Sequence, residues 1–148
     1  MLRGINPLLS PELLSILRAM GHGDEIVIAD ANFPADTNGR RVVRLDGIGA
    51  AQVIEAVLSV MPLDTYVDDP ALSMAIVGDG ETVPPVVSEF QGVIDRIADS
   101  PARIQPLERF AFYERARTAF AIVATGERRA YGNLILKKGV VAPPPGQD

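Results

Sequence analysis

Apolar residues in the first part of the chain recur at the spacing of one helix face. Leucines and a methionine follow this period through residues 11–20. Ser10 is a favoured N-cap residue, and Pro11 suits the first helical position. Gly21 follows at once and is placed for a C-terminal glycine cap. The pattern therefore predicts a helix over residues 11–20.

Short apolar runs then alternate with longer amphipathic segments. A continuous apolar run suits a strand that is buried on both faces, and such runs predict strands at residues 25–30, 41–45, 72–77, 119–125 and 134–136. Apolar stripes at helical spacing predict further helices over residues 48–61, 84–98 and 106–117. A turn-rich loop is expected over residues 32–39.

Helices that alternate with short buried strands indicate a layered α/β domain. The last two strands are close in sequence, so they could pair antiparallel and make the sheet mixed. The sequence contains no internal repeat, and we expect a single domain over residues 1–141. Residues 142–148 are rich in proline and are expected to form an extended tail.

Composition excludes several classes of function. The 148 residues are 47% hydrophobic and 22% charged, which is enough to build a core, and its side chains must be mostly aliphatic because tryptophan is absent. A net charge of -5 argues against nucleic-acid binding. No apolar stretch approaches the length of a membrane span, and the N-terminus lacks a secretory-signal pattern, so the cytoplasm is the expected location. Without cysteine, disulfides and thiolate chemistry are excluded.

His22 is the only histidine, and it lies between Gly21 and Gly23. Histidine is the side chain whose ordinary pKa is closest to neutrality, so His22 is the first candidate for proton transfer. A structural role is the alternative for a lone histidine. His22 precedes the strand predicted at residues 25–30 and Asp30 ends it, so the two border one cleft only if the flanking loops curl inward.

Two further groups of residues carry candidate chemistry. Aromatic residues gather between positions 110 and 120 beside Arg109, and they suit a core, a subunit contact or a platform for a sugar ring. Tyr131 and Asn133 offer donors and acceptors for a polyhydroxylated ligand, or they simply form a hairpin turn. A metal site is poorly supported, because one histidine and no cysteine cannot supply the usual zinc ligands.

Several separated motifs, in the same order, resemble the ribose pyranase and fucose mutarotase family. They lie at residues 1–14, 20–25, 29–34, 109–116, 120–123, 125–128 and 131–140. The resemblance covers nearly all of residues 1–141. The segment Arg-Phe-x-Phe-Tyr-Glu-Arg at residues 109–115 points to the fucose branch, because ribose-type members differ there and usually carry a further histidine.

The resemblance implies an enzyme that interconverts the α and β anomers of L-fucose or a closely related monosaccharide, with no cofactor and no metal. It implies a three-layer α/β/α fold with a mixed, mainly parallel sheet. It also implies a homo-oligomer, typically a decamer of two stacked pentameric rings with sites near subunit boundaries. In the family's pattern His22 is the acid/base residue, and the sugar-contacting positions are Asp30, Arg109, Tyr131 and Asn133.

Anomer exchange requires a sugar ring to open and close, so one oxygen loses a proton while another gains one. We hypothesise that His22 transfers these protons, with Tyr131 as a second partner, and that Asp30 binds sugar hydroxyls or orients His22. Three alternatives stay open: a non-catalytic sugar-binding accessory protein, a ribose-type pyranase acting on another sugar, and an oligomeric structural protein.

Overall fold

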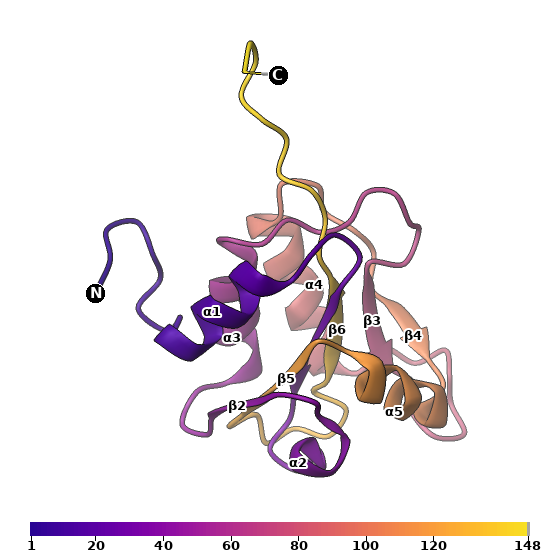
Figure 1. The fold of residues 1–148 in the computed structure, drawn as a ribbon. Helices are drawn as coiled ribbons and strands as arrows, with labels where there is room; N and C mark the ends of the chain where they lie inside the picture. Colours follow the sequence, from indigo (N-terminus) through magenta and orange to yellow (C-terminus); the bar gives the residue numbers. More distant parts are fainter. Residues whose placement is uncertain (148) are drawn as a thin grey trace.

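Six strands form one mixed sheet in a computed structural model that describes residues 1–147 (Figure 1). The sheet has the order β2-β5-β1-β6-β3-β4. Its strands are β1 (Glu25–Ala29), β2 (Val42–Leu45), β3 (Ala71–Met74), β4 (Gln105–Leu107), β5 (Ala121–Thr125) and β6 (Leu134–Lys137). The helices are α1 (Pro11–Ala19), α2 (Ala35–Asn38), α3 (Ala50–Leu58), α4 (Pro85–Ile97) and α5 (Arg109–Thr118).

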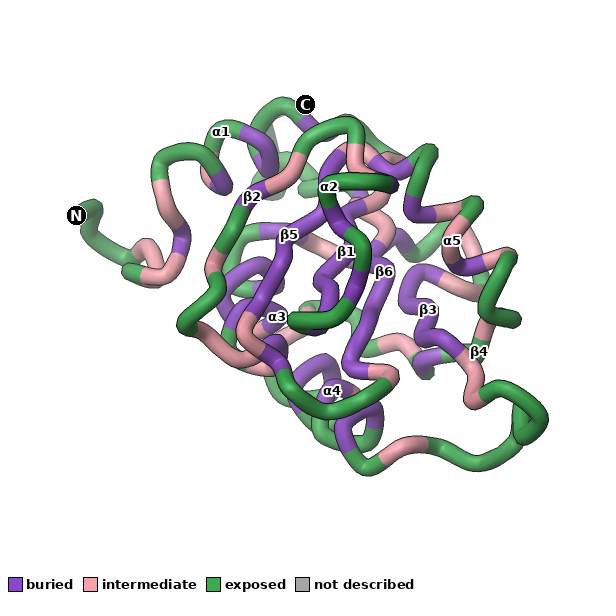
Figure 2. The backbone as a smooth tube through the Cα atoms, turned by 90° about the horizontal axis from the view of Figure 1, so that it is seen from below, coloured by how far each residue is buried: buried purple, intermediate pink, exposed green. Residues whose placement is uncertain are grey.

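Helices cover both faces of this sheet. Apolar side chains of α1, α3 and α4 pack on one face, and those of α2 and α5 pack on the other. Strand β1 serves both cores, because Ile26 and Ile28 face the first group while Val27 and Ala29 face the second. The central strands β5, β1, β6 and β3 are buried except at Glu25 and Lys137, which are partly exposed (Figure 2). The three-layer α/β/α fold with a mixed, mainly parallel sheet is thus confirmed.

The predicted pairing of the last two strands with each other is wrong. Strand β5 runs parallel to β1 and β2, whereas β6 runs antiparallel to β1 and β3. The connection at residues 126–133 crosses the end of β1, where the Ala31 N–H donates to the Glu127 carbonyl at 2.8 Å. Strand β6 is apolar on both faces, since Leu134 and Leu136 belong to one core and Ile135 to the other. A strand of this kind is stable in the middle of the sheet, between β1 and β3, where helices cover both faces.

The helix predicted over residues 106–117 begins later than its pattern suggested. Residues 105–107 form β4, which pairs with β3 through Leu107 and Met74. The Glu108 carboxylate then accepts hydrogen bonds from the backbone N–H groups of Phe110 and Ala111. This acidic N-cap fixes the start of α5 at Arg109. The short strand escaped prediction because it is exposed and contains a proline.

Smaller corrections concern loops and element ends. Helix α1 is capped by Met20 and not by Gly21, and of the two glycines that flank His22 it is Gly23 that has a left-handed backbone, at φ +85°. Residues 35–38 form α2 inside the predicted loop. Strand β3 ends at Met74, three residues before the predicted end. No helix within residues 1–147 is long and apolar enough to cross a membrane.

The C-terminal residues leave the body of the molecule as an extended arm, drawn in yellow in Figure 1. Residues 142–147 are exposed throughout. Residue 148, the last of the predicted tail, lies outside the described residues.

Candidate active site

A cavity of about 330 Å³ lies at the end of the sheet where β1 and β3 finish and β6 begins. It brings together four predicted site residues, which are Asp30, Arg109, Tyr131 and Asn133. The remaining lining residues are Asn32, Phe33, Met74, Val77, Tyr113 and Ala130. In α/β folds the carboxyl ends of parallel strands are where ligands bind, and the cavity obeys this rule for β1 and β3.

Asp30 and Asn133 form a buried, reciprocal pair at the base of this cavity. The Asn133 side-chain amide donates to one Asp30 carboxylate oxygen at 2.9 Å, and its Oδ1 accepts from the Asp30 backbone N–H at 2.8 Å. The second carboxylate oxygen accepts from the Asn32 N–H at 2.9 Å. Burial raises the pKa of Asp30 above 3.8, and the hydrogen bonds from Asn32 and Asn133 oppose that rise. The carboxylate is therefore held in one orientation with accepting capacity left for a ligand.

Tyr131 enters the cavity from a strained turn. Among the described residues, it is the only one other than glycine in the left-handed region, at φ +62°. Its hydroxyl accepts a hydrogen bond from the Val77 N–H at 3.3 Å. Because that bond uses a lone pair of the oxygen, the phenolic proton stays available for a ligand.

Gly132 follows in the tightest part of the same turn. A Cβ atom at this position would lie 2.6 Å from Cγ of Glu127 and 3.1 Å from the carbonyl oxygen of Arg129. Only a residue without a side chain allows this approach.

Replacing Gly132 with alanine is expected to destabilise the fold by about 1–3 kcal/mol, because the turn must move to admit the methyl group. Gly92→Ala is the matched control. Gly92 lies inside α4, and a Cβ atom there would meet no other atom within 4 Å, so the same change should stabilise the protein. The expected gain is about 0.5–1 kcal/mol. Urea unfolding of both variants checks the opposite signs, and equal effects would contradict them.

Aromatic side chains also line this cavity. The rings of Phe33 and Tyr113 stack, with centroids 5.4 Å apart and an interplanar angle of 27°. The Arg109 guanidinium lies 5.8 Å from the centroid of the Tyr113 ring. An apolar face beside fixed hydrogen-bond donors suits the two faces of a sugar ring. The sequence pattern marks Tyr113 only as part of an aromatic cluster, although its position four residues after Arg109 places both on one side of α5.

His22 lies at the opposite end of the sheet from the cavity in the same chain. The Gly23 N–H donates to the Lys138 carbonyl, beyond the end of β6, whereas Asn133 precedes its start. The strand steps from residue 25 to Asp30 alone span about 17 Å. The expectation that His22 and Asp30 border one cleft is therefore wrong within a single chain, because the loops at the two ends of β1 do not meet.

A buried carboxylate holds the imidazole. His22 Nε2 lies 3.0 Å from Oδ1 of Asp64, and the His22 side chain is 46% exposed while that of Asp64 is 3% exposed. A carboxylate only accepts, so Nε2 is the donor and Nδ1 is left to accept a proton. Burial acts to raise the pKa of Asp64, but hydrogen bonds from the Tyr66 N–H and from His22 outweigh it, and the net pKa is lowered. Asp64 thus stays ionised and orients the ring.

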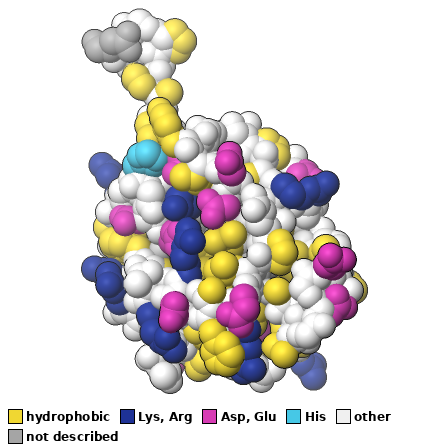
Figure 3. All heavy atoms as spheres, turned by 90° about the vertical axis from the view of Figure 1, so that its right-hand side faces the viewer, with side chains coloured by type: hydrophobic (Ala, Val, Ile, Leu, Met, Phe, Trp, Pro, Cys, Tyr) yellow, Lys and Arg dark blue, Asp and Glu magenta, His cyan; other side chains and the backbone are white. Residues whose placement is uncertain are grey.

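The face around this imidazole is open. Tyr66 is 77% exposed, and its ring centroid lies 5.3 Å from that of His22. Figure 3 shows the imidazole in cyan at the surface, close to the base of the C-terminal arm. Sequence reasoning missed Asp64 because it is 42 positions from His22, and no local pattern links the two.

A glutamate supports the turn that carries Tyr131. Glu127 is buried, and its carboxylate accepts from Arg129 through Nε and Nη2, each at 2.8 Å. The hydrogen bonds from Arg129 lower the pKa of Glu127 from 4.5 to about 2.

This lowered pKa predicts a pH-dependent contribution to stability. A carboxyl group with a depressed folded-state pKa stabilises the protein above its ordinary pKa and loses that contribution as the pH falls through the folded value. The gap in unfolding free energy between the wild type and Glu127→Gln should therefore be constant above pH 4.5 and shrink towards pH 2. Urea unfolding at a series of pH values measures it, and a gap that stays constant to pH 2 would contradict the assignment.

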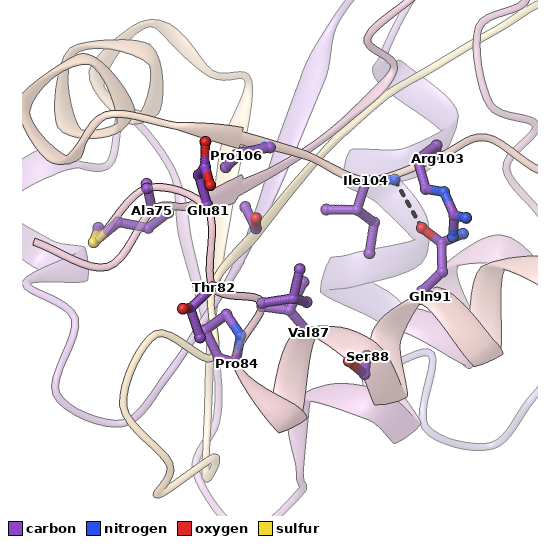
Figure 4. Close-up of a pocket in the computed structure, with 14 residues that line it drawn as sticks. Ala75, Glu81, Thr82, Pro84, Val87, Ser88, Gln91, Arg103, Ile104 and Pro106 are labelled. Carbon is purple, nitrogen blue, oxygen red and sulfur yellow. Dashed lines mark hydrogen bonds between the residues drawn. The ribbon is translucent and has the colours of Figure 1, made fainter. Parts of the chain in front are cut away.

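A larger hollow of about 420 Å³ lies beside the site, under the loop that precedes α4 (Figure 4). Its floor is formed by apolar side chains such as Val87 and Ile104. Among its polar lining residues, Gln91 already accepts from the Ile104 N–H at 2.8 Å. The smaller cavity is the better candidate site, because there a buried carboxylate, two amides, two phenols and a guanidinium converge.

Within residues 1–147, no group of three or more histidine, cysteine, aspartate or glutamate side chains is arranged to hold a metal ion.

The fold and the cavity define a small α/β protein with one mixed sheet and a polar pocket with an aromatic wall, suited to a polyhydroxylated ligand. The chain belongs to the RbsD / FucU transport protein family, whose sequence profile matches residues 3–141. The family resemblance in the sequence is thus confirmed.

Individual relatives match over nearly their whole length. The fucose mutarotase of Homo sapiens is 52% identical over 147 residues, which cover 95% of this chain and 95% of the human protein. The L-fucose mutarotase of Actinobacillus pleuropneumoniae serotype 5b (strain L20) is 48% identical over 141 residues, with 95% and 97% covered. The crystal structure of the fucose mutarotase from Streptococcus pneumoniae in complex with L-fucose superposes with a TM-score of 0.88 at 42% identity, covering 95% of this chain and all of that one.

Proposed function

We propose that the protein is an isomerase, a mutarotase that interconverts the α and β anomers of L-fucose or a closely related monosaccharide. The observation that carries the proposal is the cavity in which Asp30, Asn133 and Arg109 converge beside the stacked rings of Phe33 and Tyr113. The relatives named fucose mutarotase, at about half identity over nearly full length, support the same activity.

The reaction needs proton transfer at two oxygens of the sugar. Ring opening breaks the bond between C1 and the ring oxygen: the C1 hydroxyl loses a proton, C1 becomes an aldehyde carbon, and the ring oxygen gains a proton. Rotation about the C1–C2 bond presents the other face of the aldehyde, and the reverse steps close the ring. The sugar's electrons and total proton count are unchanged, so acid/base groups alone satisfy the chemistry.

Residues of the cavity bind the sugar and provide one of the two proposed proton-transfer groups. Asp30 accepts hydrogen bonds from sugar hydroxyls, while Asn133 and Arg109 position the ring. Tyr131 is the proposed proton-transfer partner, because its phenolic proton is free while its oxygen is anchored by the Val77 N–H. Tyr113 lines the same cavity and is a second phenol within reach of a bound sugar.

His22 is the proposed acid/base residue, and we propose that it acts in the cavity of a neighbouring copy. Its distance from Asp30 in one chain rules out a shared site there, whereas its partly exposed ring is held by a buried carboxylate and faces outward. The exposed Tyr66 beside it supports a contact surface at this place. The proposed assembly is the homo-oligomer that the family resemblance implies, a decamer of two pentameric rings, with the cytoplasm as its location.

The activity is tested by saturation-transfer NMR of L-fucose in anomeric equilibrium. We expect the wild-type protein to accelerate exchange between the two anomeric C1 protons well above the spontaneous rate. D-Ribose as a second substrate distinguishes a ribose-type pyranase. Saturable fucose binding without accelerated exchange of any sugar would instead identify a sugar-binding protein, the alternative that the transport wording of the family name favours.

The shared site is tested by mixing two inactive variants. His22→Ala lacks the imidazole and Asn133→Ala lacks a pocket residue, so each homo-oligomer should be inactive. If each site combines two copies, random co-assembly after joint expression gives about one quarter of sites with both residues intact. Recovery of about a quarter of the wild-type exchange rate is expected, and no recovery in mixed oligomers would contradict a site that combines two copies.

A further inference from the structure

The connection between β5 and β6 carries two residues of the proposed site, yet it is held at its middle by a charged pair outside the cavity. Glu127 accepts from Arg129 at three places: its Oε1 from the backbone N–H at 3.0 Å and from Nε at 2.8 Å, and its Oε2 from Nη2 at 2.8 Å. This two-pronged arrangement closes the chain on itself within two residues. We name it the Glu127–Arg129 clasp.

Glu127 is also tied to the strands on either side. Its backbone N–H donates to Thr125 Oγ1, which in turn donates to the Ala29 carbonyl at the end of β1. Its carbonyl accepts from the Ala31 N–H at 2.8 Å. The Glu127 side chain is 7% exposed, so Glu127 is a buried residue. Through these hydrogen bonds it is linked to Ala29 and Ala31, the residues on either side of Asp30.

The clasp packs against the turn that carries Tyr131 and Asn133. Gly132, between them, packs so closely on the Glu127 side chain that a methyl group would collide with its Cγ. The left-handed backbone of Tyr131 is an unfavourable conformation and persists only where its surroundings enforce it. The Glu127 side chain of the clasp packs directly against this turn.

We propose that Glu127 and Arg129 are positioning residues for the sugar reaction: their clasp sets the turn that presents the Tyr131 hydroxyl and the Asn133 amide to the substrate. Neither residue is among those that line the cavity. This proposal rests on the proposed function, since it assigns both residues a role in that reaction.

Glu89 supplies a matched control on the outer side of the clasp. Arg129 Nη1 lies 2.7 Å from Oε2 of Glu89, and both side chains are about half exposed. An exposed ion pair of this kind contributes little to the folded state. Removing the Glu89 charge therefore leaves the clasp intact and changes only its solvent-facing contact.

The test compares Glu127→Gln, Arg129→Gln and Glu89→Gln. In the first two, kcat/KM for anomer exchange of L-fucose is expected to fall about ten- to a hundred-fold, since small displacements of catalytic groups cost this much. Glu89→Gln should stay within about two-fold of the wild type. Arg129 is half exposed, so Arg129→Gln keeps the test valid if Glu127→Gln does not fold.

A second measurement follows the turn without relying on activity. The side-chain amide protons of Asn133, bonded to Asp30 in the wild type, should exchange faster with solvent in the two clasp variants and not in Glu89→Gln. Wild-type kcat/KM in both folded clasp variants, or unchanged exchange of these amide protons, would overturn the proposal. If the wild type itself catalyses no anomer exchange, the proposed function fails, and the amide measurement still decides whether the clasp holds the turn.

Discussion

Replacing His22 with alanine is expected to lower the catalysed rate of fucose anomer exchange by about 10²–10⁴-fold, the usual contribution of a positioned acid/base group. The loss should lie in kcat, because His22 transfers protons and the hydroxyl-binding groups belong to the cavity around Asp30. The fold should survive, since the His22 side chain is almost half exposed. Saturation-transfer NMR measures the rate, and thermal unfolding checks the fold.

His22→Gln separates proton transfer from hydrogen bonding. The glutamine amide can still donate to Asp64, but it cannot take up and release a proton near neutral pH. We therefore expect His22→Gln to be as inactive as His22→Ala. Wild-type exchange in His22→Ala would remove His22 from the mechanism, and wild-type exchange in His22→Gln alone would reduce its role to a hydrogen bond.

Asp30→Asn is expected to have the second largest effect, a fall in kcat/KM of about 10–150-fold. Both carboxylate oxygens accept bonds from donors in the folded protein, namely the Asn32 N–H and the Asn133 amide. An asparagine offers only one oxygen, so its NH₂ group would face one of those donors. A hydrogen bond between a charged group and a sugar hydroxyl is also worth about 1.5–3 kcal/mol, and the substitution weakens it.

Asp36→Asn is the control for removing a carboxylate. Asp36 is exposed and pairs with Arg44 at 3.1 Å on the surface of the molecule, so its loss should leave kcat/KM within about two-fold of the wild type. Exchange rates measured over a range of fucose concentrations separate kcat from KM. Equal effects of the two substitutions would show that Asp30 has no special role in the reaction.

The strands and helices that could be predicted are those whose apolar pattern lies within a short stretch of sequence. Continuous apolar runs identified β1, β5 and β6, because strands buried on both faces need apolar side chains in succession. Strand β4 was missed because its side chains are largely exposed and its pattern merges with the following helix. The partners of β6 were missed because pairing depends on which distant strands have two covered faces, and residue spacing does not encode this.

The candidate site divides in the same way. Asp30, Arg109, Tyr131 and Asn133 were identified through motifs, and the fold brings all four to one cavity. The strand predicted between His22 and Asp30 already indicated that the two are separated, and the sequence left open only whether the flanking loops curl towards each other. Asp64 was missed because it is recognised only through its contact with His22, which is distant in sequence. The Glu127–Arg129 clasp was missed because nothing in the sequence shows that the Glu127 carboxylate is buried.

The position of β6 has a consequence for the order in which the sheet can form. Residues 134–137 follow every other strand of the sheet in the sequence, yet they fill the middle of the sheet between β1 and β3. Before β6 is in place, β1 and β3 each present an unpaired apolar edge, and such edges are the surfaces through which incompletely folded chains aggregate. The two parts of the sheet, β2-β5-β1 and β3-β4, are therefore joined only when β6 pairs with both.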